Sequence, residues 1–114
     1  MKTHPNFSNG DIMDTEKYFR KLGYDLAMGY DSIKLLKVST EEIHFFQTMT
    51  KEEIRIYVDD IRETAQWEKQ VISEIGKIMI PEPHTMPKYI IEFHKLENYV
   101  IEGYCDAIYN LTEK

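Results

Sequence analysis

The chain has 114 residues and a formal net charge of -6, a size that suits one domain around one hydrophobic core. Hydrophobic residues make up 42% and aromatic residues 12% of the sequence, which excludes a largely disordered chain. The acidic balance disfavours direct binding to nucleic acid or to an anionic membrane surface, because both carry negative charge themselves.

The first predicted element is a long helix over about residues 14–37, which Asp14 or Thr15 can cap. The polar residues 1–13 before it indicate a flexible N-terminal arm without the apolar core of a signal peptide. Gly29 lies on the apolar seam of this helix, where it costs about 1 kcal/mol relative to Ala, so we expect another helix to approach closely there. The seam follows the three- and four-residue steps of one helical face and comprises Phe19, Leu22, Leu26, Gly29, Ile33 and Leu36.

Two helix starts follow, at residues 39–42 and 50–53, each with Ser or Thr followed three residues later by Glu. This pattern is typical of a capping box, in which two side chains satisfy free amides at a helix N-terminus. We therefore expect a short helix over about residues 40–48 and a second long helix over about 51–79. The predicted seam of the long helix comprises Ile54, Val58, Ile61, Ala65, Glu68, Ile72, Ile75 and Met79.

A proline-rich corner should end the second long helix, because proline removes an amide donor and restricts the residue before it. The third long helix is predicted over about 86–111, and residues 14–114 then form one all-α domain. Three long helices with short links predict an elongated antiparallel bundle. A helical hairpin completed by a second copy of the chain is the alternative. The corner prolines are Pro81, Pro83 and Pro87.

One predicted polar layer inside the bundle contains Glu68, His94 and Glu97, and Asp25 could join it. Carboxylates and an imidazole on facing helices are what a metal or an acid/base site needs. The alternative is that Glu68 rotates to the edge of the bundle and pairs with Lys95. We predict no cofactor and keep the metal site as a weaker hypothesis.

The acidic excess is concentrated between Glu41 and Glu74, a segment that contains nine acidic residues and four basic residues. Its centre is predicted to be Asp59, Asp60 and Glu63, which could dock a basic partner protein. A merely solvated face that keeps the chain soluble is the other interpretation of this charge.

A second candidate surface lies on the first helix, at positions off its apolar seam. Tyr and Met are enriched in protein interfaces, although they also occur at the edges of bundles. The predicted patch comprises Tyr24, Met28 and Leu35, flanked by Tyr18 and Tyr30.

Motifs for nucleophilic catalysis and phosphate binding are missing from the sequence. The single cysteine, Cys105, lies beside an apolar stripe, where we expect a buried, inert thiol. It fits a reducing compartment, and the sequence contains no apolar run of about 20 residues that could span a bilayer. We predict a cytoplasmic, non-enzymatic protein-binding module that acts as a regulator, adaptor or inhibitor. A metal-binding bundle and a homo-oligomeric structural bundle, such as a homodimer, are the alternatives.

Overall fold

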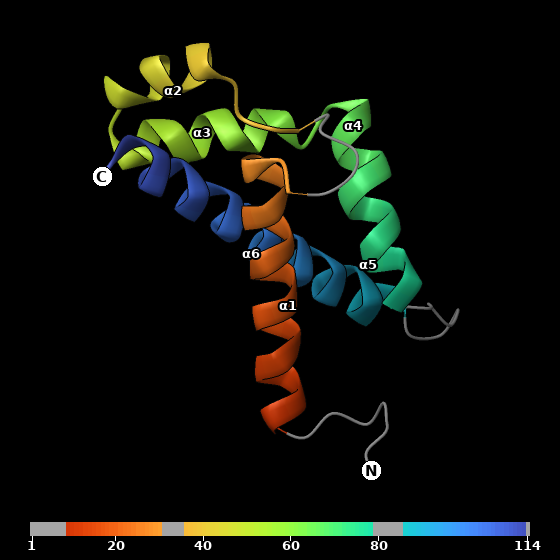
Figure 1. The fold of residues 1–114 in the computed structure, drawn as a ribbon. Coiled ribbons are helices and arrows are strands. Elements are labelled where there is room, and N and C mark those ends of the chain that lie inside the picture. Colours follow the sequence, from red (N-terminus) through yellow and green to blue (C-terminus); the bar gives the residue numbers. More distant parts are fainter. Residues whose placement is uncertain (1–8, 31–35, 79–85, 114) are drawn as a thin grey trace.

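The computed structural model describes residues 9–30, 36–78 and 86–113, and within these ranges the chain is all-α with no strand (Figure 1). The predicted fold class is therefore confirmed. The body measures 45 × 28 × 28 Å, with a radius of gyration of 15.2 Å, against about 13 Å for a compact domain of this size. The elements are α1 (Asn9–Met28), α2 (Thr40–Gln47), α3 (Lys51–Ile61), α4 (Ala65–Trp67), the π-helical turn η1 (Glu68–Ile72), α5 (Ser73–Ile78) and α6 (Met86–Thr112).

Helix α6 is the common packing partner, because α1, α2, α3, η1 and α5 all contact it. In Figure 1 it runs diagonally through the molecule, with α1 crossing it and α3 lying along its C-terminal half. Its observed bounds agree closely with the predicted helix 86–111. The hydrophobic core surrounds α6. The largest fully buried side chains of the core include Trp67, Phe19, Phe46, Ile54, Ile75, Ile101 and Ile108.

The crossing of α1 over α6 depends on two glycines that face each other. A Cβ atom on Gly23 would overlap the backbone carbonyl oxygen of Val100, and one on Gly103 would overlap that of Arg20. The two backbones therefore meet at a distance that only glycine permits. The sequence predicted such a contact, but at Gly29, and that placement is wrong.

Gly29 instead ends α1, which the sequence had extended to residue 37. Its φ of +76° lies in the left-handed region, and its N–H donates to the Leu26 carbonyl (3.2 Å) while that of Tyr30 donates to Asp25 (3.0 Å). These two bonds are those of a Schellman cap, which glycine favours. The helix also begins earlier than predicted, at Asn9, inside the predicted arm 1–13, and so includes Gly10 in spite of the low helix propensity of glycine.

The segment after α1 is hydrogen-bonded to both α1 and α6. The Val38 N–H donates to the Ala27 carbonyl (2.8 Å), and the buried Tyr104 hydroxyl of α6 donates to the Leu36 carbonyl (2.6 Å). The chain then enters α2, whose start at Thr40 and whose capping box between Ser39 and Glu42 were both predicted. The second capping box, which opens α3, is confirmed as well.

The predicted long helix 51–79 is broken, and this part of the prediction is wrong. Helix α3 ends at Ile61, and the Asp60 carbonyl accepts the N–H groups of Arg62 and Glu63 in the turn that follows. The Thr64 side chain then caps a new helical segment by accepting the Trp67 N–H (3.3 Å). This second N-cap redirects the chain, so that α4 and α5 leave α3 at a corner (Figure 1).

Candidate functional site

Helix α3 carries its two basic residues on one side and most of its carboxylates on the other, with the Arg55–Asp59 pair at the boundary. Ile54 and Val58 are fully buried and fix its inner face. The basic residues of α3 lie toward α6: the Lys51 ammonium is 4.8 Å from the ring centroid of Tyr109, and Arg55 Nη2 donates to Asn98 Oδ1 (2.6 Å). The positive charge of α3 is therefore engaged in holding the helix to α6.

The opposite side of α3 carries carboxylates around one apolar side chain. Residues spaced three or four apart share a face of a helix, and this spacing places the acidic residues one turn before and one turn after Ile56. Ile56 is 62% exposed. We call this surface the outer face of α3; it comprises Glu52, Glu53, Ile56, Asp59, Asp60 and, in the following turn, Glu63.

Of the three acidic residues predicted at the centre of the docking surface, Asp60 and Glu63 lie at the exposed C-terminal end of this outer face, and Asp59 lies at its edge beside Arg55. Asp59 is half-buried and pairs with Arg55, with 3.5 Å between Oδ1 and Nε. Asp60 and Glu63 are exposed and form no ion pair with any other residue in the described ranges. Asp60 lies in the last turn of α3, where a carboxylate opposes the helix dipole, and the C-cap residue Arg62 is the nearest basic residue in sequence.

Ile56 was missed by the sequence prediction, which assigned the apolar seam of α3 to Ile54 and Val58. Its signal was an isoleucine off the seam with acidic residues three and four positions away on both sides. A second exposed apolar side chain lies nearby on α2: Phe45 is 53% exposed, and its ring centroid is 6.2 Å from that of Tyr57. The outer face of α3 is therefore amphipathic rather than purely acidic.

A chain of polar contacts holds α3 rigidly against the body of the protein. Arg55 donates to Asn98 Oδ1, and Asn98 Nδ2 donates to Glu102 Oε2 (3.1 Å). Glu102 is paired with Arg20 of α1, which also binds Glu16 (2.8 Å). This network links α3, α6 and α1, so the outer face of α3 is presented on a fixed support.

The predicted polar layer of Glu68, His94 and Glu97 does not assemble. Glu68 is exposed and forms no pair with Lys95 within the described structure, whereas Glu97 is buried and accepts the Trp67 indole N–H (2.9 Å). His94 is exposed, with its Nδ1 3.8 Å from Glu97 Oε1. Asp25 pairs with Lys21 (2.7 Å) instead. Among the described residues no group of three or more His, Cys, Asp or Glu side chains could hold a metal ion.

The predicted aromatic and methionine patch is partly used by the fold itself. The Tyr24 hydroxyl accepts a hydrogen bond from Asn110 Nδ2 (2.6 Å), and the Tyr18 hydroxyl donates to Glu74 Oε2 (2.6 Å). This hydrogen bond raises the pKa of Tyr18 and lowers that of Glu74. Tyr30 is exposed, and Leu35 lies outside the described residues.

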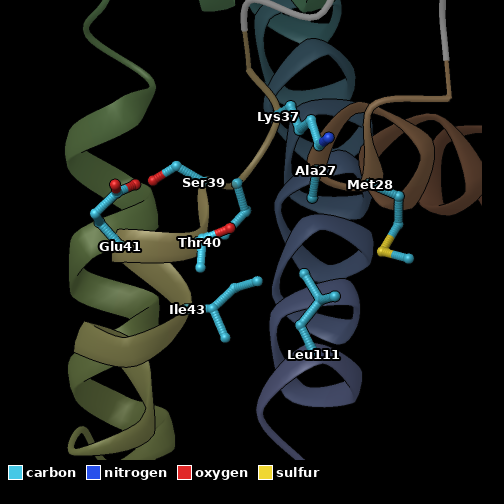
Figure 2. Close-up of a pocket in the computed structure, with 9 residues that line it drawn as sticks. Ala27, Met28, Lys37, Ser39, Thr40, Glu41, Ile43 and Leu111 are labelled. Carbon is cyan, nitrogen blue, oxygen red and sulfur yellow. The ribbon is translucent and has the colours of Figure 1, made fainter.

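Met28 lines a pocket of about 550 Å³ between α1, α2 and the end of α6 (Figure 2). Figure 2 shows Ile43 of α2 and Leu111 of α6 on opposite sides of it. Its rim carries both a lysine and a glutamate, so its charge favours no particular ligand class. The lining residues are Ala27, Met28, Lys37, Val38, Ser39, Thr40, Glu41, Ile43 and Leu111.

Cys105 is buried as predicted. Burial raises the pKa of its thiol to about 11, so the reactive thiolate is scarce at neutral pH. Of the helices that the structure describes, none is both long and apolar enough to cross a membrane.

Comparison with known proteins finds no matching family model, no similar curated protein and no similar solved structure. A function for this chain therefore has to be argued from the geometry and charge of its own residues.

Proposed function

We propose that this chain is a small, non-enzymatic protein-binding module that docks a basic partner on the outer face of α3. As a regulator, adaptor or inhibitor it would act by occupying that partner. The observation that carries the proposal is the separation of charge on α3. Lys51 and Arg55 are engaged with α6, whereas Asp60 and Glu63 are exposed without an ion pair among the described residues.

The unfavourable position of Asp60 at the C-terminal end of α3 supports the proposal. A carboxylate in the last turn of a helix opposes the helix dipole by about 0.3–1 kcal/mol, and in α3 only the C-cap Arg62, outside that last turn, adds a positive charge at this end. The side chains of Asp60 and Glu63 contribute no contact to the core. Local rules of this kind are broken most often where a residue serves binding rather than folding.

The proposal is tested by reversing the charge of the outer face. The variant carries Asp59→Lys, Asp60→Lys and Glu63→Lys. Its control carries Glu41→Lys, Glu68→Lys and Glu113→Lys, three exposed residues on other elements with the same change in charge. Proteins cross-linked to each chain in cell extract are then compared by quantitative mass spectrometry, and unfolding in urea is followed for each chain.

We expect at least one protein to be captured by the native chain and by the control but lost from the outer-face variant. That protein should be basic, because charge complementarity selects it. Partner binding that is unchanged in the outer-face variant, with its stability intact, would contradict the proposal.

A second candidate function, homo-oligomer formation, is favoured by a different surface. Ile78 at the end of α5, and Ile90 and Ile91 near the start of α6, are between 47% and 66% exposed. Large exposed apolar side chains, where they form one patch, are typical of association surfaces. Native mass spectrometry over a dilution series distinguishes the two candidates: a stable dimer abolished by Ile91→Glu supports this one, and a monomer at all concentrations contradicts it.

A further inference from the structure

The outer face of α3 has a regular pattern that specifies more than a basic partner. Ile56 is preceded by Glu52 and Glu53 and followed by Asp59 and Asp60. On a helix these carboxylates lie about one turn, roughly 5 Å, to either side of the isoleucine. The surface thus presents an apolar centre between two acidic positions along a helix of 11 residues.

We infer that the partner docks as an amphipathic basic helix, with an apolar side chain against Ile56 and Lys or Arg side chains one turn before and after it. This inference rests on the proposed function and adds the form of the ligand. Helices bind helical surfaces through anchors at intervals of three and four residues. That spacing matches the row of acidic and apolar residues on α3.

Charge excludes the other occupants of this face. A second copy of the chain would bring Asp60 and Glu63 against an equally acidic surface, and like charges across an interface oppose binding. Nucleic acid and anionic membranes are polyanions and are repelled in the same way. A cationic helix is attracted, and two exposed carboxylates without an ion pair among the described residues, Glu52 before Ile56 and Asp60 after it, are placed to receive its charges.

Ile56 gives this contact its specificity. An apolar side chain at the centre of an interface excludes water, and the surrounding charge pairs then strengthen because the local dielectric falls. Phe45 of α2, whose ring meets that of Tyr57 edge to face, supplies further apolar area along one side of α3. A helix with basic residues on every side could satisfy the carboxylates but would leave Ile56 and Phe45 in water.

The support beneath α3 lowers the cost of docking. Arg55 is bound to Asn98 (2.6 Å) and through it to Glu102 and Arg20. These contacts join α3 to α6 and α1 in the unbound chain, and a surface that is already formed loses less conformational entropy on binding.

The test uses two synthetic peptides of identical composition. In the first, one leucine-rich face is flanked by lysines at helical spacing; in the second, the same residues are permuted so that leucine and lysine alternate around the helix. Binding of each labelled peptide to the full-length chain is measured by fluorescence anisotropy. The variants are Ile56→Ala and Asp60→Lys with Glu63→Lys. The matched control is Ile91→Ala, because Ile91 is 66% exposed on α6.

We expect the amphipathic peptide to bind at least tenfold more tightly than its permuted isomer. Ile56→Ala should weaken the amphipathic peptide about tenfold, and Ile91→Ala should leave its affinity unchanged. The charge-reversed variant should bind neither peptide.

The outcomes separate this inference from the proposed function. Equal binding of both isomers, or an Ile56→Ala variant with native affinity, overturns the amphipathic helix while leaving a basic partner in place. The same holds if neither peptide binds although charge reversal removes a captured protein. If neither peptide binds and charge reversal changes no captured protein, both proposals fall together.

Discussion

The charged groups at the crossing of α1 over α6 are paired with one another, whereas most of those on the outer face of α3 are not. At the crossing, Arg20 is shared between Glu16 and Glu102, with Asp106 3.9 Å away, and its guanidinium lies 6.0 Å from the ring centroid of Tyr99. On the outer face, Asp60 and Glu63 have no such partner within the described residues. The charged groups at the crossing hold helices together, whereas Asp60 and Glu63 take no part in such contacts among the described residues.

The largest loss of stability is expected at the crossing, where a Cβ atom added to either glycine would overlap the backbone of the other helix. Gly23→Ala should lower the free energy of unfolding by about 3 kcal/mol, because the new Cβ would overlap the α6 backbone. Urea denaturation measures the loss. Gly76→Ala is the matched control: no atom lies within 4 Å of its added Cβ, so it should raise stability by about 0.5–1 kcal/mol. Equal effects at the two glycines would mean that the close crossing is not formed in solution.

A smaller loss is expected at Glu97, a buried carboxylate of α6 that lies outside the Arg20 network. Trp67→Phe removes the N–H that Glu97 accepts and should cost about 2 kcal/mol, because a buried acceptor loses its donor. Glu97→Gln keeps an oxygen that the indole can reach and should cost less, as measured by urea denaturation. If Glu97→Gln were the more damaging change, the charge of Glu97 rather than its hydrogen bond would hold α4 to α6.

Much of the local structure could be predicted from the sequence, because it depends on neighbouring residues. The capping boxes at Ser39 and Thr50 each lie within four residues of chain, and both formed where expected. Gly23 and Gly29 could not be told apart in this way. One is needed where α6 crosses and the other where α1 ends, and only the assembled fold decides which.

In the candidate site, too, some residues could be identified from the sequence, whereas the positions of others depend on the folded structure. Asp59, Asp60 and Glu63 were singled out by charge density, a property of sequence alone. Ile56 was missed because the prediction followed the periodic buried stripe and did not weigh an isoleucine that lies off that stripe between acidic residues. Glu68 was misplaced because the predicted seam continued past Thr64, whose N-cap starts a new helical segment and changes the direction of every later side chain.

The smallest stability effect is predicted on the outer face, and it has the opposite sign. Asp60→Lys with Glu63→Lys should raise the free energy of unfolding by about 0.3–1 kcal/mol, because it places cations at the negative end of α3. Thermal unfolding at low salt measures the gain, and higher salt should reduce it. A clear loss of stability would show that these carboxylates serve the fold, and the contrast between the two regions would fail.

The central claim is that the outer face of α3 is the docking surface, and chemical-shift mapping tests it most directly. The isotopically labelled full-length chain is titrated with the amphipathic basic peptide while backbone amide signals are recorded. We predict that the largest shifts occur at Glu52, Ile56, Asp60 and Glu63, with little change at Ile78 and Ile91. Shifts centred on the corner between α5 and α6 or on the pocket beside Met28, or none at saturating peptide, would contradict the account.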